Sequence, residues 1–165
     1  GDTVLGFDWI QANGGIAFES TYPYTSVASG ETGTCRTSTP NGGKISGYTY
    51  ATPACFEDEG CLSQDEATLA ANLASTAPVS ICVDAWSWQF YESGVMIGEE
   101  WECSTGYAEL NHCVQLVGFN TEDPTPYWVV RNSWSPDWGE GGFIRLAYGA
   151  NTCGLADEAV FVSIA

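Results

Sequence analysis

Residues 110–119, Leu-Asn-His-Cys-Val-Gln-Leu-Val-Gly-Phe, contain the single histidine of the chain, directly followed by a cysteine. The alternation of apolar residues predicts a strand, with His112 on the same face as Val114 and Leu116 and Cys113 on the other face. Neighbouring residues of a strand do not hydrogen-bond side chain to side chain, so Cys113 is not a thiol that His112 serves. His112 is then a structural residue, a metal ligand or a base for a group from elsewhere.

The next apolar run favours the catalytic interpretation. Residues 127–149, YWVVRNSWSPDWGEGGFIRLAYG, place Asn132 at the end of a second strand. From there its side-chain carbonyl can accept a hydrogen bond from the imidazole and fix the tautomer of the ring. Trp134, two residues later, can cover that bond and keep water out.

The rest of the chain predicts an α+β fold with mostly antiparallel strands. A short helix is expected over residues 4–12, ended by Asn13-Gly14-Gly15. A second helix follows a capping box at Ser63–Glu66 and ends before Pro78. Residues 18–43 show no periodic pattern of apolar residues that would predict a helix or a strand. Strands are expected at 44–51, 79–85, 112–119, 127–134, 141–148 and 158–164.

The charge balance narrows the classes of partner. The 165 residues include 21 acids against 4 Lys and Arg, a formal net charge of -17. Such a field repels phosphate groups, so nucleic acid and anionic membranes are not expected as partners, whereas cationic peptides are attracted. No stretch of about 20 apolar residues that would cross a bilayer occurs.

The cysteines point to an oxidising compartment and not to a metal. Seven cysteines in a chain of this size are typical of secreted or vacuolar proteins with disulfides, and the odd count leaves one thiol free or paired outside the chain. Cys55 and Cys61 flank an acidic turn and are close enough for a local disulfide. There is no C-x-x-C or H-x-x-x-H spacing, so neither a zinc site nor another cofactor is expected.

Five separated motifs follow one another along the whole chain: GFDWIQANGGIAFESTYPY, NHCVQLVGF, YWVVRNSW, DWGEGGFIRL and NTCGLADEA. In this order they resemble the motifs of the papain-like cysteine peptidases of the cathepsin L type. The resemblance implies a two-domain fold, with residues 1–42 as the remnant of the helical left domain and residues 43–165 as the β-barrel-like right domain.

The resemblance assigns roles to individual residues. His112 resembles the family's general base and Asn132 the residue that orients it, while Trp134 and Trp138 resemble the indoles that shield the pair. The family's nucleophilic cysteine and its oxyanion-hole glutamine both lie in a segment upstream of the position of Gly1. Gln115, in a core strand, is not that glutamine. The chain alone is therefore expected to lack half of the catalytic apparatus.

The same comparison implies a substrate pocket and a pattern of disulfides. Glu158 falls where some members hold a glutamate at the floor of the S2 pocket, although it could instead face solvent as most carboxylates do. Cys103 is expected to pair with Cys153, and Cys35 with a cysteine outside the chain, which leaves Cys82 and Cys113 as buried thiols. The residues expected to contact substrate are Gly1, Thr3, Cys82, Leu110, Asn111 and Glu158.

The expected function is therefore that of the C-terminal part of an endopeptidase that hydrolyses peptide bonds through an acyl-thioester. Its S2 pocket would accept apolar residues and also arginine, whose guanidinium pairs with a carboxylate. Its partners would be a peptide or protein substrate and an upstream segment carrying the nucleophile, in a lysosome-like acidic compartment or outside the cell. The alternative is a non-catalytic homologue that acts as a structural or interaction subunit.

Overall fold

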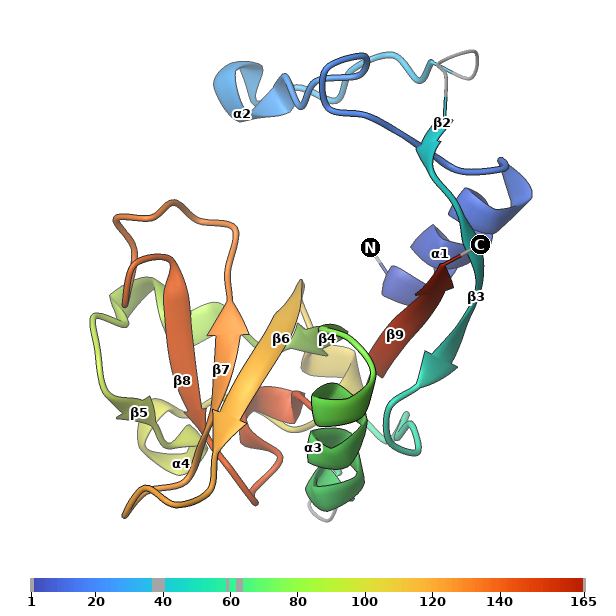
Figure 1. Cartoon of the computed structure of the whole chain (residues 1–165). Coiled ribbons are helices and arrows are strands. Elements are labelled where there is room, and N and C mark those ends of the chain that lie inside the picture. The colour runs from blue at the N-terminus through green and yellow to red at the C-terminus, as the bar shows by residue number, and fades with distance from the viewer. Residues whose placement is uncertain (1, 37–40, 59, 62–63, 165) are drawn as a thin grey trace. The chain divides into compact units, whose positions relative to one another are not determined.

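The computed structural model describes residues 2–36, 41–58, 60–61 and 64–164, and the described residues fall into two compact units (Figure 1). The larger unit comprises the first three residues and Thr49–Phe161. The smaller one comprises Val4–Tyr48 and Val162–Ala165. The proposed family domains, residues 1–42 and 43–165, stay a prediction.

The smaller unit is built from short elements. A helix, α1 (Thr3–Ala12), ends at two glycines with positive φ, Gly14 and Gly15, and the Gly15 N–H donates to the carbonyl of Ile10 at 2.9 Å. This left-handed ending agrees with the predicted stop. The unit also contains a one-turn helix, α2 (Ser26–Ser29), and the antiparallel pair of β1 (Ile16–Ala17) and β2 (Asn41–Gly43).

A seven-stranded sheet contains most strands of the chain, in the order β3-β9-β4-β6-β7-β8-β5 (Figure 1). The pairs β4–β9, β4–β6, β6–β7 and β7–β8 are antiparallel, and β5–β8 is parallel. The strands are β3 (Ile45–Tyr50), β4 (Val79–Val83), β5 (Val95–Met96), β6 (His112–Asn120), β7 (Tyr127–Arg131), β8 (Phe143–Ala147) and β9 (Ala159–Ile164).

Every predicted strand is present, and the α+β, mostly antiparallel class is confirmed. The sheet is open, however, and not a closed barrel, because β3 and β5 lie at its two ends and do not pair with each other. The short helices of the larger unit are the 3₁₀ turns η1 (Trp86–Phe90), η2 (Tyr107–Glu109) and η3 (Thr152–Gly154) and the one-turn helix α4 (Gly98–Trp101). Within the described residues, no helix is long and apolar enough to cross a membrane.

Helix α3 (Glu66–Ser75) covers part of the sheet and lies beside β4 and β6 in Figure 1. Its buried Leu69 joins Leu116 of β6 and Trp128 of β7 in one continuous hydrophobic core. Alternate residues of β6, β7 and β8 contribute much of this core, which is the pattern that the apolar alternation predicts.

The predicted capping box at the start of α3 is wrong. Asp65 is the N-cap, and its carboxylate accepts hydrogen bonds from the Thr68 N–H at 2.9 Å and the Thr68 hydroxyl at 2.6 Å. Ser63, the expected cap, lies outside the described residues. The Glu66 side chain does not hydrogen-bond the main chain at the start of the helix, because its carboxylate is buried and bound by donors from distant segments. These are the Trp128 indole at 2.6 Å and the N–H groups of Gly149 at 2.8 Å and Asn151 at 2.7 Å.

The structure contains the Cys55–Cys61 and Cys103–Cys153 disulfides. The expectation that Cys82 and Cys113 are buried thiols is wrong, because they form a third disulfide. The two residues lie directly opposite each other on antiparallel β4 and β6, with a Cα–Cα distance of 4.0 Å. Facing side chains of such strands are close enough to bridge. Among the described residues, Cys35 is exposed and free, and its predicted partner outside the chain stays a prediction.

Replacing the buried Glu66 by glutamine is expected to lower the free energy of unfolding by about 2–4 kcal/mol, because a glutamine amide would face N–H donors that now meet an acceptor. Urea unfolding of Glu66→Gln beside Glu122→Gln, an exposed acid in a turn, measures the difference. Equal midpoints for the two variants would show that the Glu66 hydrogen bonds add nothing to stability.

Candidate active site

His112 and Asn132 are brought together by the pairing of β6 with β7. His112 is the first residue of β6, and Asn132 directly follows the last residue of β7. The His112 Nε2 lies 2.9 Å from the Asn132 Oδ1, which also accepts from the Ser133 N–H at 2.8 Å. Because an amide oxygen only accepts, Nε2 carries the proton of the neutral ring. The Nδ1 atom is then left as the basic nitrogen.

Three indoles surround this pair. The Trp134 ring stacks on the His112 ring, with centroids 5.1 Å apart and an interplanar angle of 25°. Trp88 meets the same imidazole edge-on at 6.4 Å. Trp138 contacts both tryptophans, since its ring stacks on Trp88 at 6.2 Å and meets Trp134 at 5.3 Å. Packing against Trp134 and Trp88 favours one orientation of the imidazole ring.

Sequence reasoning missed Trp88. The segment containing it, WSWQFY, has the pattern of aromatic core, and Trp88 is indeed fully buried. It also contacts the imidazole, which the sequence does not indicate, because Trp88 lies 24 positions before His112 and no spacing rule connects a 3₁₀ turn with a distant strand. The sequence placed Trp134 at the site by its position two residues after Asn132, and it placed Trp138 there only through the family resemblance.

A tight loop between β7 and β8 presents Trp134 and Trp138. Its ends are joined by the Asn132 N–H, which donates to the Gly142 carbonyl at 2.9 Å, and by the Gly142 N–H, which donates to the Trp138 carbonyl at 2.8 Å. Gly142 has φ of +91°, and a Cβ there would lie 3.3 Å from the Ser135 carbonyl oxygen. Glycine is therefore required at this position for the loop to close.

A small cavity of about 310 Å³ adjoins the imidazole, lined by Asp2, Thr3, Asn111, His112 and Cys113. It brings two of the predicted substrate-binding residues, Thr3 and Asn111, beside His112. Gly1, also predicted there, lies outside the described residues. Cys82 is bonded to Cys113 and lies behind it, with 3% of its surface exposed.

Glu158 is also linked to this group. The Thr3 hydroxyl donates to its Oε1 at 3.0 Å, and only 3% of the residue is exposed, so the alternative that Glu158 faces solvent is wrong. The negative charge of Glu158 acts on Tyr107: burial raises the pKa of the phenol, and the charges of Glu158 and Asp2 raise it further. A buried carboxylate is stabilised by a cationic partner.

The residue before Glu158 is a second acid, Asp157, which is completely buried. Its Oδ1 accepts from the Asn151 amide at 2.6 Å, and its Oδ2 has no partner. Burial raises the pKa of this carboxyl to about 7, while the Asn151 hydrogen bond opposes the rise. The predicted pocket residue Leu110 lies close by, since a Cβ on Gly154 would meet both the Leu110 side chain at 2.7 Å and the Asp157 Oδ2 at 3.0 Å.

The arrangement is an imidazole held by Asn132 and packed against indoles, and the cysteine next to it in the chain has no free thiol. Cys113 is bound to Cys82, so it has no thiol to offer His112. No cluster of three His, Cys, Asp or Glu side chains that would hold a metal ion occurs in the described ranges. A base in one tautomer, covered by indoles and beside a cavity, can take a proton from a thiol or water brought to its Nδ1.

Known proteins share both the sequence and the fold. Residues 1–163 match the model of the papain family cysteine protease. The chain is 38% identical over 158 residues to cysteine proteinase 1 of Dictyostelium discoideum, covering 92% of the chain and 40% of that protein. It is 40% identical over 156 residues to a cysteine proteinase of Trypanosoma brucei brucei, covering 93% of the chain and 31% of that protein. The chain thus spans well under half the length of these relatives.

Solved structures agree. Digestive procathepsin L 3 from the larval midgut of Tenebrio molitor superposes with a TM-score of 0.79 at 32% identity, over 99% of this chain and 48% of that one. The bromelain protease of Ananas comosus, solved in complex with the E64 inhibitor, superposes with a TM-score of 0.74 at 31% identity, over 98% of this chain and 69% of that one. With its motifs, its fold and its His112–Asn132 pair, the chain belongs to the papain family of cysteine proteases.

Proposed function

We propose that this chain supplies the base-bearing part of a cysteine endopeptidase, with His112 as the general base and Asn132 as the residue that orients it. The observation that carries the proposal is the 2.9 Å contact between the His112 Nε2 and the Asn132 Oδ1 under the stacked Trp134 ring. The chain covers only 40% and 31% of two related proteinases, so a segment upstream of it would provide the thiol and the oxyanion-hole glutamine.

The proposed reaction uses the free Nδ1 of His112. This nitrogen takes the proton of the upstream thiol, and the thiolate attacks the carbonyl carbon of the scissile peptide bond. The C–N bond breaks as the imidazolium returns the proton to the leaving amine, which leaves an acyl-thioester. Water, deprotonated by the same nitrogen, attacks the thioester, and the acid product and the thiol are released. Asn132 holds the ring in place through both steps.

The intact geometry speaks against the alternative of a non-catalytic subunit. A homologue that had lost its chemistry has no need of a base held in one tautomer by Asn132 and covered by Trp134 and Trp88. In this proposal the peptide substrate and the upstream segment are the partners of the chain.

An acidic compartment, lysosome-like or extracellular, fits two observations on the larger unit. Three disulfides need an oxidising environment to form. Asp157 is buried with one oxygen unpaired, and its pKa is raised to about 7. A carboxyl in that position is accommodated at low pH, where it is neutral, and is destabilising at high pH, where it must ionise.

We further propose that Glu158 forms the floor of the S2 pocket, with Thr3 and Leu110 as walls. The buried carboxylate and the Thr3 hydroxyl bound to it support this assignment. Such a pocket would accept large apolar residues at P2 and also arginine, whose guanidinium the carboxylate can pair with.

Replacing Asn132 by alanine in the full-length protein should lower kcat/KM for a peptide substrate by about 100-fold, because the imidazole loses the acceptor that fixes its tautomer. Asn120→Ala, an equal change at the far end of β6, serves as the control and should keep its activity. Hydrolysis of a fluorogenic peptide gives both values. A wild-type protein that neither cleaves peptides nor reacts with a thiol-directed peptide epoxide would refute the peptidase proposal.

Glu158→Gln keeps the volume of the side chain. It should reduce kcat/KM for a peptide with arginine at P2 by about 10-fold, or about 1.4 kcal/mol, and leave kcat/KM for a peptide with leucine at P2 within about 2-fold. The reason is that the amide no longer pairs with a guanidinium. Paired measurements of kcat/KM on two peptides that differ only at P2 test it. An equal loss of kcat/KM on both peptides would show that Glu158 does not form part of the S2 pocket.

The raised pKa of Asp157 predicts a pH dependence of stability. The carboxyl ionises near 3.8 when unfolded and near 7 when folded, so between these values the folded state holds more protons and the contribution of Asp157 to stability falls as pH rises. The free energy of unfolding of wild type, relative to Asp157→Asn, should fall by about 1 kcal/mol per pH unit between about pH 4.5 and 6.5. Urea titrations with the exposed Asp58→Asn as control measure this; parallel curves for wild type and Asp157→Asn would contradict it.

A further inference from the structure

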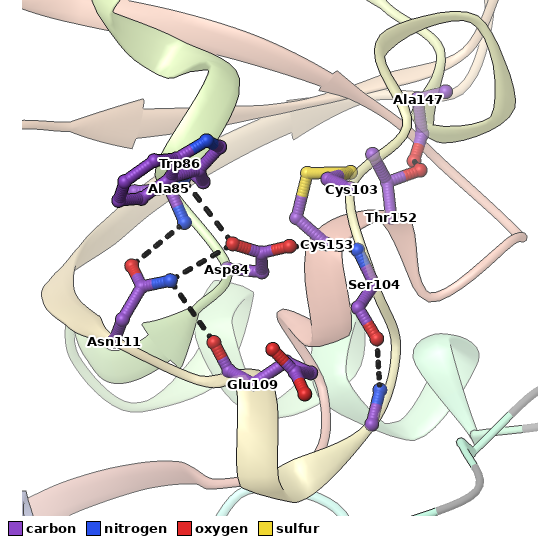
Figure 2. Close-up of a disulfide and its surroundings, with 11 residues drawn as sticks. Asp84, Ala85, Trp86, Cys103, Ser104, Glu109, Asn111, Ala147, Thr152 and Cys153 are labelled. Carbon is purple, nitrogen blue, oxygen red and sulfur yellow. Dashed lines mark hydrogen bonds between the residues drawn. A yellow bond between two sulfur atoms is a disulfide. The ribbon is translucent and has the colours of Figure 1, made fainter.

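The cluster in Figure 2 lies at the end of β4 and the start of β6, next to His112. Val83 and His112 are the last facing pair of these two strands. Asp84 and Asn111 are the next residues beyond that pair, and the Asn111 N–H donates to the Val83 carbonyl at 3.0 Å. Whatever fixes Asp84 and Asn111 therefore also fixes the main chain at the base.

The carboxylate of Asp84 is buried, with 7% of the residue exposed, and is bound by N–H groups from three segments (Figure 2). Its Oδ1 accepts from the Asn111 amide at 2.9 Å and from the Trp86 N–H at 3.2 Å, and its Oδ2 accepts from the Ser104 N–H at 2.8 Å. The N–H of Asp84 itself donates to the carbonyl of Cys153 at 2.9 Å. Asp84 thus binds both segments that the Cys103–Cys153 disulfide joins.

The side chain of Asn111 is used entirely within this cluster. Its Nδ2 donates to the Asp84 Oδ1 and to the Glu109 carbonyl at 3.0 Å, and its Oδ1 accepts from the Ala85 N–H at 3.0 Å. Both amide hydrogens are therefore engaged. Asn111 was expected to contact substrate, but a side chain bonded in this way has no donor left to offer a peptide.

The chemistry of the cluster requires a carboxylate at position 84. The groups that face it, from Asn111, Trp86 and Ser104, are all donors. An acceptor-only side chain satisfies them, whereas an asparagine would turn its own N–H₂ toward at least one of them. An unsatisfied buried donor costs about 1–3 kcal/mol. The buried carboxylate of Asp84, bound only by N–H groups, therefore lies close to His112, because Asp84 directly follows Val83, the strand partner of His112.

We infer that Asp84 is a positioning residue, which clamps Asn111 and so holds the main chain of His112 where its ring meets Asn132. The inference rests on the proposed peptidase function. Asn132 orients the His112 ring through a hydrogen bond to its side chain, whereas Asp84 acts on the His112 main chain through its hydrogen bond to Asn111. Misplacement of a base by about 1 Å costs up to about 100-fold in rate without a matching loss of substrate binding.

The test is a double-mutant cycle in the full-length protein. Asp84→Asn turns an amide toward N–H donors, and Asn111→Asp places two carboxylates at hydrogen-bond distance. In the double variant the pair is exchanged, and an amide at 84 can again donate to a carboxylate at 111. Each single variant should lose about 10-fold in kcat with KM within about 2-fold, and the double variant should lose no more than either single one. Independent effects would multiply to about 100-fold.

Glu102→Gln is the matched control. Glu102 lines the same cavity as Asp84 and Asn111, and within the described part of the chain no hydrogen bond joins its side chain to either residue, so its replacement removes a nearby charge and leaves the clamp. Wild-type kcat in Glu102→Gln supports the clamp. A loss in Glu102→Gln equal to that in Asp84→Asn, a loss confined to KM, or multiplying losses in the double variant would each overturn the proposal.

A readout without catalysis separates the two proposals. Amide hydrogen exchange at residues 111–113 should be at least about 10-fold faster in Asp84→Asn than in Glu102→Gln, because the clamp protects this segment. An inactive wild type with that difference would refute the peptidase function alone, and equal exchange would refute the clamp alone. If Asp84→Asn does not fold, Asn111→Ala carries both measurements, since it deletes the clamp at an exposed position.

Discussion

The pairing of β4 with β6 is the constraint on which the site depends. Its register sets Cys82 opposite Cys113 and Val83 opposite His112, and the next residues beyond the pair are Asp84 and Asn111. A slip of one residue would turn every side chain of β6 to the other face and remove the base from Asn132. The register is held at two adjacent places, by the Cys82–Cys113 disulfide and by the Asp84–Asn111 hydrogen bond.

Buried carboxylates in this acidic chain are accommodated in two ways. With 21 acids against 4 Lys and Arg, few cationic side chains are available to form an ion pair with a buried carboxylate. Glu66 and Asp84 are bound by N–H donors from segments far apart in the sequence, and each joins those segments to the sheet. Asp157 receives a single donor, and its pKa is raised to about 7 because the ionised form is poorly solvated. Glu66 and Asp84 therefore each anchor several segments, whereas Asp157 is bound through one hydrogen bond.

Much of the fold could be predicted from local pattern, because alternation marks each strand and the glycines after Ala12 mark a helix end. The His112–Asn132 pair could be predicted because both residues lie at strand ends within recognisable motifs. The Cys82–Cys113 disulfide, the contact of Trp88 with the imidazole and the bonds of Asp84 could not. The disulfide, the Trp88 contact and the Asp84 bonds to Asn111 and Ser104 join segments 20 or more residues apart, which no local pattern encodes. The cap of α3 was misplaced for a smaller reason, since both Ser63 and Asp65 are good N-cap residues.

The contacts that hold the proposed base come from within the larger unit. The ring of His112 is bonded to Asn132 and stacked against Trp134, and its main chain is tied through Asn111 to Val83 and Asp84, all residues of that unit. A thiol brought to the Nδ1 of such a ring meets a base whose tautomer and orientation are already set, so little reorganisation remains for the chemical step. The free energy of that preorganisation is supplied during folding, by the hydrogen bonds and disulfides that surround His112.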